Sequence, residues 1–125
     1  MTNPLPPIIS RYFTAADDGD IDALIGCFTP NAVVTDEGRS WHGHAKIRQW
    51  REDVATAYEY TVEILGTESV GDQGGLDRHD VITRLEGNFP GGTVDLTYRF
   101  GLLDGRIAEL RIAPPPATAA GGTGS

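Results

Sequence analysis

The sequence contains one cysteine, Cys27, and therefore cannot form an internal disulfide. Cys27 lies among apolar residues, a setting typical of a buried, reduced thiol rather than of a nucleophile. No apolar run approaches the ~18 residues that a membrane span needs, and the N-terminal residues show no signal-peptide pattern. We therefore expect a soluble, cytoplasmic protein that does not bind membranes.

Positive charge is scarce as well. The chain has 10 Lys and Arg residues against 18 Asp and Glu residues, which gives a net charge of −8 at pH 7. This balance opposes binding to phosphate backbones, and the sequence has no glycine-rich loop of the kinds that cradle phosphates. Nucleic acid and nucleotide cofactors are therefore not expected as partners.

Large apolar residues are missing from the C-terminal end of the chain. From Pro114 to Ser125 the sequence consists of Pro, Ala, Thr, Gly and Ser, which predicts a disordered tail. The remaining length fits one compact core and is too short for two. We expect a single domain over residues 1–113.

Apolar residues recur at helical spacing in the N-terminal half and predict three helices. The first lies within residues 6–20, where prolines suit its first turn and a glycine suits its end. The second covers residues 21–28, and the third covers residues 44–59. A short strand, residues 31–37, is predicted between the second and third helices.

The C-terminal half changes to the pattern of strands. Runs rich in β-branched and aromatic residues alternate with glycine-containing turns, and they predict strands at residues 60–70, 78–89, 92–103 and 106–113. Three helices followed by consecutive strands predict an α+β domain, with the helices packed on one face of a curved, mostly antiparallel sheet. A pocket is expected between the two layers.

Several motifs carry a family resemblance. Three segments, residues 8–38, "WHGHAKIRQW" and "YRFGLLDGRIAEL", resemble in this order the nuclear transport factor 2-like superfamily, in particular its SnoaL-like polyketide cyclases and ketosteroid isomerases. The resemblance covers about residues 5–113 and implies a cystatin-like, cone-shaped α+β barrel that is open at one end. It also implies a homodimer formed through the outer face of the sheet.

The same resemblance assigns a base and an oxyanion donor. Since side chains alternate along a strand, Val34 and Asp36 should point one way and Glu37 the other. The resemblance places the isomerases' general base at Asp36 and their hydrogen-bonding tyrosine at Tyr12. A carboxylate partly removed from water is a stronger base, and a phenol stabilises the negative charge that builds on a carbonyl oxygen.

The isomerases have a second donor, a protonated aspartic acid, which has no counterpart here. Its position falls on Leu96, Thr97 or Tyr98, of which Tyr98 could supply a weaker donor, whereas Asp95 is out of phase. His42 is a candidate second proton carrier, because the pKa of histidine lies close to neutrality. The expected substrate-binding residues are Trp41, Trp50, Tyr58, Tyr98 and Phe100.

Simpler interpretations compete with these roles. Asp36 could end its strand by accepting backbone hydrogen bonds in the turn before Gly38, and Tyr12 and Trp50 could be core residues. Arg39 could pair with Glu37 or Asp36, and pairing with Asp36 would weaken the base. A metal site could combine His42, His44 and His79 with Asp36 and Glu37, but H-x-H is unspecific, and we expect no metal.

The sequence therefore predicts cofactor-free proton transfer on a small apolar carbonyl compound by an isomerase, cyclase or dehydratase. The alternative is a ligand-binding or assembly module of the same fold without turnover, because one fold hosts many functions. An epoxide hydrolase would require two aspartates and an arginine around a water, of which only Asp36 can be placed.

Overall fold

The computed structural model describes residues 5–36, 38–57, 59–88 and 91–114. Its helices are α1 (Pro7–Asp18), α2 (Ile21–Ile25) and α3 (Gly43–Ala57). Its strands are β1 (Phe28–Asp36), β2 (Arg39–His42), β3 (Tyr60–Gln73), β4 (Leu76–Gly87), β5 (Thr93–Leu103) and β6 (Arg106–Ala113). The C-terminal residues 115–125, for which the sequence predicts a disordered tail, lie outside the described ranges.

The ends of the first two helices have local causes. Pro7 stands in the first turn of α1, where a missing N–H costs nothing, and Gly19 ends that helix with a φ of 70°. Asp20 then begins α2, because its carboxylate accepts a hydrogen bond from the Ala23 N–H at 3.1 Å. This short link turns the chain between the two helices.

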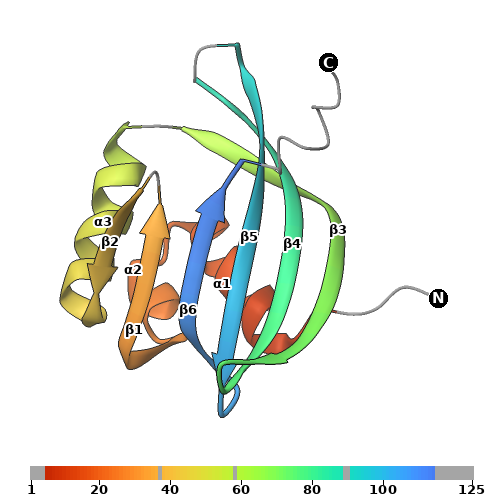
Figure 1. The fold of residues 1–125 in the computed structure, drawn as a ribbon. Coiled ribbons are helices and arrows are strands. Elements are labelled where there is room, and N and C mark those ends of the chain that lie inside the picture. The colour runs from red at the N-terminus through yellow and green to blue at the C-terminus, as the bar shows by residue number, and fades with distance from the viewer. Residues whose placement is uncertain (1–4, 37, 58, 89–90, 115–125) are drawn as a thin grey trace.

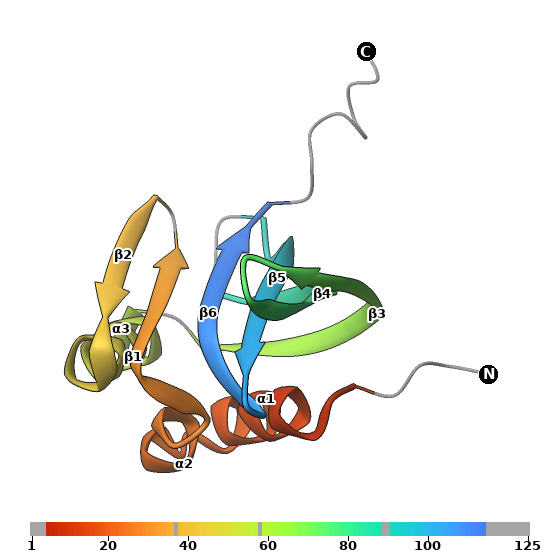
Figure 2. The same cartoon turned by 60° about the horizontal axis from the view of Figure 1, so that its bottom comes forward.

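The six strands form one curved sheet in the order β2-β1-β6-β5-β4-β3 (Figure 1). Neighbouring strands are antiparallel except β1 and β6, which are parallel. The helices lie on one side of this sheet (Figure 2). The predicted α+β class, with helices on one face of a curved, mostly antiparallel sheet, is confirmed.

Two differences from the sequence prediction go beyond a shift of strand ends by a few residues. The second helix ends at Ile25 rather than at residue 28, because Phe28 already belongs to β1 and pairs with Ile107 of β6. Strand β2 was not predicted, since its four residues show no clear strand pattern. It exists because the chain reverses at Gly38, with a φ of 77°, and then pairs with β1.

The pairing registers define two faces of the sheet. Asp36, Ile112, Tyr98 and Val81 stand opposite one another on successive strands, and this row faces the helices. We call this side the inner face. It contributes to a core of fully buried side chains between the sheet and the helices, among them Ile9, Phe28, Val34, Ile47, Val81, Phe100, Ile107 and Leu110.

The other side of the sheet, the outer face, carries charged residues. A row across the central strands contains Asp80, Arg99 and Arg111, which stand opposite one another in register. None of the helices in the described ranges has both the length and the apolar character needed to cross a membrane.

Candidate active site

Asp36 is the last residue of β1 and is half-buried on the inner face. The strand alternation that the sequence predicts is present, since Val34, two residues earlier, is fully buried in the core. The indole Nε1 of Trp50, a buried residue of α3, donates a hydrogen bond to Asp36 Oδ2 at 3.1 Å. This bond connects the helix layer to the carboxylate and fixes the orientation of its Oδ2 atom.

Tyr12 lies on the face of α1 that packs against the sheet, and only 1% of its surface is exposed. Within the described ranges, its ring makes edge contacts with four other aromatic rings, those of Phe13, Phe28, Tyr98 and Phe100. Burial raises the pKa of Tyr12 well above its ordinary value, Arg51 opposes this shift, and Asp36 adds to it. Tyr12 is therefore a neutral phenol at physiological pH, able to donate a hydrogen bond but not to act as a base.

Tyr98 provides a second buried phenol next to the first. Its ring centroid is 6.4 Å from that of Tyr12, and it lies on the inner face of β5. Burial raises the pKa of Tyr98 well above its usual range, Tyr12 raises it further, and Arg51 and Asp36 act in opposite directions. Asp95 lies on the outer face instead, where Arg84 Nε donates to its Oδ1 at 2.9 Å.

Arg51 is the residue that sequence reasoning missed. It belongs to α3, is only 8% exposed, and donates from Nη1 to the Tyr60 hydroxyl oxygen at 3.2 Å. Its Cζ lies 5.4 Å from the centroid of the Trp50 ring, a distance at which cation–π attraction operates. Its Nε is buried and has no hydrogen-bond partner within the part of the chain that the structure describes.

The spacing of α3 could have revealed Arg51. The residue stands four positions after Ile47 and three before Val54, so it falls on the same helical stripe as these apolar residues. Sequence reasoning considered only the aromatic residues of this helix, Trp50 and Tyr58, as site residues. A charged residue in the middle of a buried stripe is the signal that was available.

The electrostatics join these side chains into one group. Burial acts to lower the pKa of Arg51. Tyr12, Tyr60 and Tyr98 together raise that pKa by more than burial lowers it, so the overall shift is upward and the side chain remains a cation. Asp36 in turn acts on both Tyr12 and Tyr98. We call Asp36, Tyr12, Tyr98, Tyr60 and Arg51 the interior polar cluster.

His42 does not join this cluster. It stands opposite Val33 on the outer side of the β1–β2 pair, which is also the side of the hydrogen bond between Thr35 and Ser40. Its side chain is exposed, whereas Asp36 belongs to the opposite face. Because alternation separates the two residues across the strand pair, the structure does not support His42 as a proton carrier for Asp36.

The remaining histidines have other contacts. His44 Nε2 bonds to the Phe28 carbonyl oxygen at 3.0 Å, and His79 Nε2 bonds to Asp77 Oδ2 at 2.9 Å. Among the described residues there is no group of three or more side chains suited to hold a metal ion. Glu37, one of the metal-site candidates, and Tyr58, an expected pocket residue, lie outside the described ranges.

The other aromatic candidates differ in their exposure. Trp41 is half-buried, lies 6.2 Å from Trp50 between ring centroids, and has the Arg39 guanidinium 5.4 Å above its ring. Phe100 is fully buried and packs against both Tyr12 and Tyr98. Trp41 can therefore contact a ligand directly, whereas Phe100 shapes the interior from within the core.

The two hollows that the structure describes lie away from the cluster. One, of about 460 Å³, is on the outer face and is lined by Val70, Arg78, Asp80, Arg99, Glu109 and Arg111. The other, of about 380 Å³, lies between β2 and α3 and is lined by Arg39, Ser40, Trp41, His42, Lys46 and Gln49. Neither hollow is the pocket that the sequence predicts on the inner face, where aromatic rings pack around Tyr12. That pocket stays a prediction.

Comparisons with known proteins agree on the family. The family model of the SnoaL-like domain matches residues 9–110. A candidate polyketide cyclase from Sinorhizobium meliloti is 42% identical, with a TM-score of 0.78, and the match covers 87% of this chain and 95% of that one. SalBIII, an epoxide hydrolase/cyclase-like enzyme of pyran ring formation in salinomycin, is 26% identical, with a TM-score of 0.70 and coverages of 86% and 88%.

A more distant structure shows the fold alone. A Catenulispora acidiphila protein with a ketosteroid isomerase-like fold is 17% identical, with a TM-score of 0.75, and the match covers 88% of this chain and 86% of that one. Comparison with curated proteins gives no match. With the family model covering most of its length, the chain belongs to the SnoaL-like domain family and has the nuclear transport factor 2-like fold.

Proposed function

We propose that the protein is a cofactor-free enzyme that transfers a proton on a small apolar carbonyl compound, as an isomerase, cyclase or dehydratase. The observation that carries this proposal is the placement of three polar side chains in the interior. Half-buried Asp36 and buried Tyr98 stand on either side of Ile112 on the inner face, and the buried ring of Tyr12 lies 6.4 Å from that of Tyr98 between centroids. A base and two hydrogen-bond donors in an otherwise apolar interior are the groups that enolisation requires. The 42% identity to a candidate polyketide cyclase supports the same class of reaction.

In this proposal Asp36 removes a proton from the carbon next to the substrate carbonyl. The electron pair of the broken C–H bond forms a C=C bond, and the carbonyl π electrons move to oxygen. Tyr12 and Tyr98 donate hydrogen bonds to that oxygen and stabilise its negative charge without losing their own protons. In a substrate with a C=C bond beside the α carbon, protonated Asp36 returns its proton to the far carbon of that bond, and the double bond moves into conjugation with the carbonyl. In a substrate with a second carbonyl, the enolate carbon attacks that carbonyl carbon and closes a ring, the π electrons move to its oxygen, and protonated Asp36 gives its proton to the resulting alkoxide.

The surrounding side chains position these groups. The indole of Trp50 holds Asp36 Oδ2, so that the carboxylate is oriented before the substrate enters. We propose Trp41 and Trp50 as walls that contact the apolar body of the substrate, together with Tyr98. Tyr58 remains a proposed member of this wall.

Hydrogen exchange at carbon tests the proposal without knowledge of the natural substrate. 2-Tetralone, a fused-ring ketone, exchanges its α protons for deuterium in D2O, and NMR measures how far the protein accelerates this exchange over buffer. Asp36→Asn should reduce the acceleration by roughly 10²- to 10⁴-fold, the usual contribution of a general base. Asp95→Asn is the matched control, because Asp95 lies on the outer face. Equal exchange rates for wild type and Asp36→Asn would contradict the proposal.

A ligand-binding module without turnover is the second candidate. The close packing of rings around Tyr12, which leaves it 1% exposed, favours it, because a substrate must displace some of these contacts to reach the phenol. A binder would hold an apolar ligand equally well after Asp36→Asn and would not accelerate exchange. For an epoxide hydrolase, Arg51 could serve as the required arginine, but the interior polar cluster contains no second aspartate.

We also propose that two copies of the chain associate through the outer face, as the family resemblance implies. The outer hollow of about 460 Å³ contains both arginines and acids, a composition that allows two copies of one surface to pair by charge. Analytical ultracentrifugation should give twice the chain mass. Arg99→Glu should shift the protein toward the monomer without altering exchange at the inner face.

A further inference from the structure

We propose that Arg51 is the recognition site for an anionic oxygen, a carboxylate or an enolate, on an otherwise apolar ligand. Three observations carry the inference: the guanidinium is buried, it forms no ion pair among the described residues, and its Nε has no hydrogen-bond partner there. The inference goes beyond proton transfer, because binding an anion at Arg51 does not require Asp36 to act as a base.

The energetics of burial make this arrangement informative. A charged group removed from water costs several kcal/mol unless a partner charge and hydrogen bonds replace its hydration. The Tyr60 hydroxyl and the Trp50 ring offset part of this cost for Arg51, but neither carries a negative charge. A bound carboxylate or enolate would supply the missing charge, and the planar fork of N–H groups matches two oxygens side by side.

Arg48 shows what the same helix does with an arginine that has only a structural contact. It stands three residues earlier on α3, its side chain is 42% exposed, and its Nη2 pairs with Asp22 Oδ1 at 2.6 Å. Arg51 has the deeper position and lacks an acid within the described residues. Among the described residues, Arg48 thus has a carboxylate partner where water already screens its charge, and Arg51 has none where a carboxylate would have its greatest effect.

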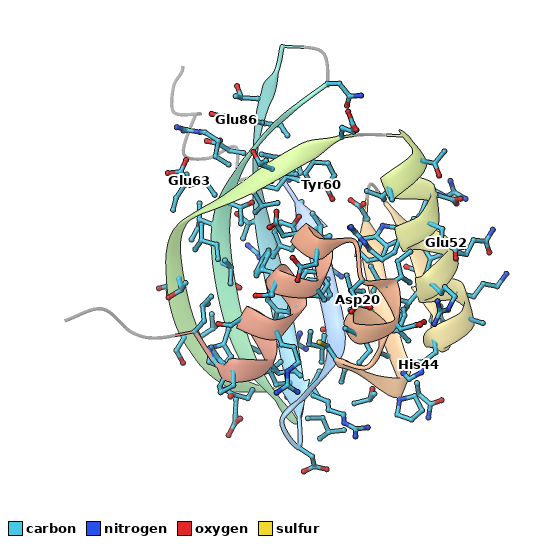
Figure 3. The ribbon with its side chains drawn as sticks, turned by 180° about the vertical axis from the view of Figure 1, so that it is seen from behind. Asp20, His44, Glu52, Tyr60, Glu63 and Glu86 are labelled. Atoms are coloured by element: carbon cyan, nitrogen blue, oxygen red, sulfur yellow. The ribbon has the colours of Figure 1, made fainter. Side chains whose placement is uncertain are left out.

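The neighbours of Arg51 define the rest of the ligand. Tyr60 lies at the start of β3 and on its inner side, whereas Glu52, which follows Arg51 on α3, points away from the interior (Figure 3). The Trp50 ring supplies apolar surface against the guanidinium, and the Tyr60 hydroxyl accepts one of its hydrogen bonds. These neighbours favour a flat, apolar ligand with one acidic oxygen, which enters by displacing some of the ring contacts around Tyr12.

Equilibrium binding of a matched pair of probes tests this inference. 2-Naphthoate and 2-naphthamide have the same ring and nearly the same shape, but only the first carries a negative charge. Isothermal titration calorimetry at pH 7 should show that wild-type protein binds 2-naphthoate at least about tenfold more tightly than 2-naphthamide. Arg51→Gln should abolish this preference, and Arg51→Lys should retain only part of it, because lysine keeps the charge but not the fork.

Two further variants separate recognition from a structural role. Arg48→Lys makes the same exchange one turn earlier and should leave the preference unchanged. Arg51→Met replaces the buried cation with an apolar side chain of similar length, and such replacements are often neutral or stabilising. An unchanged or higher melting temperature with loss of the preference would support a binding role.

Three results would overturn the inference. They are failure of wild-type protein to bind 2-naphthoate at millimolar concentration, equal affinity of wild type for the two probes, and a preference that survives in Arg51→Gln. These results differ from failure of the proposed proton transfer, since 2-naphthoate has no exchangeable proton on carbon and 2-tetralone has no charge. Each proposal can therefore fail while the other stands.

Discussion

Arginine side chains lie on both sides of this sheet, and their partners differ between the two sides. On the outer face three arginines lie next to carboxylates, in the pairs Arg78–Glu109, Arg84–Asp95 and Arg99–Asp80. On the inner face Arg51 of the helix layer contacts a phenol and an indole instead. The outer pairs are partly exposed, so water and salt screen them, while Arg51 interacts with neutral groups in a medium of low polarity.

This difference separates stability from function. The outer pairs satisfy charges that water would satisfy almost as well, so each contributes little to folding. The inner face gains its stability from rings and aliphatic side chains, and the interior polar cluster interrupts that apolar surface at a cost. A costly polar group in a core is expected where the protein binds or reacts with a ligand.

The largest expected effect compares adjacent residues of β5 that point to opposite faces. Phe100 is fully buried among aromatic rings, and Phe100→Ala should lower the free energy of unfolding by about 3–5 kcal/mol, because it leaves a cavity. Arg99→Ala, on the outer face, should cost less than about 1 kcal/mol. Urea unfolding followed by circular dichroism measures both values, and equal losses would contradict the distinction between the faces.

The next effect concerns a glycine at the rim of the inner face. A Cβ at Gly87 would lie 2.3 Å from the Glu59 carbonyl oxygen and 2.5 Å from Tyr60 Cβ, so the start of β3 would have to move. Gly87→Ala should cost about 1–3 kcal/mol and weaken the hydrogen bond between Tyr60 and Arg51. Thermal unfolding and 2-naphthoate affinity report the two effects.

Gly101 provides the comparison for this substitution on the outer face. A Cβ there would lie 2.8 Å from Leu76 Cδ1 and 3.1 Å from Arg78 Nη1, which are the ends of flexible side chains. Gly101→Ala should therefore cost less than Gly87→Ala and leave 2-naphthoate affinity unchanged. A larger loss for Gly101→Ala would mean that the rim at Tyr60 tolerates movement.

Alkaline pH should reveal the buried phenols of the inner face. Burial raises the pKa of Tyr12, so above pH ~10, where an ordinary phenol ionises, the unfolded chain loses this proton while the folded chain keeps it. The unfolded state then binds fewer protons, and stability falls as the pH rises. At pH 11 the contribution of one such phenol is about 1.4 kcal/mol. Tyr12→Phe should reduce the loss between pH 9 and 11 by that amount, and an unchanged loss would place the phenol in water.

The sequence predicted the fold better than the site, for a physical reason. Helices and strands with an apolar face can be recognised from the spacing of their apolar residues. The sequence therefore predicted α1, α3 and the four C-terminal strands to within a few residues. Strand β2 has no such stripe and depends on pairing with β1, a contact that local sequence does not encode. Tertiary pairing also shortened the second helix at Phe28.

The site residues also differ in whether local sequence or tertiary pairing determines their position. The inward direction of Asp36 follows from alternation along one strand, and the structure has it. The outer position of His42 depends on the register between β1 and β2, which could not be read before that strand was known. Arg51 was missed although its helical spacing was visible, because only the aromatic residues of that helix were considered for the site.

The smallest expected effect belongs to an outer-face pair, Arg84 and Asp95. Two hydrogen bonds, at 2.9 and 3.2 Å, connect them across β4 and β5, and the bonding by Arg84 lowers the pKa of Asp95 below its ordinary value. A lowered pKa stabilises the fold above the ordinary aspartate pKa, and this stabilisation disappears as Asp95 takes up its proton in more acidic solution. A double-mutant cycle with Arg84→Gln and Asp95→Asn should give a small coupling at pH 7 that vanishes at pH 2 and in 1 M salt, because both charges are exposed. A coupling that survives 1 M salt would show that this part of the outer face excludes water as the inner face does, and it would remove the contrast on which the role of Arg51 rests.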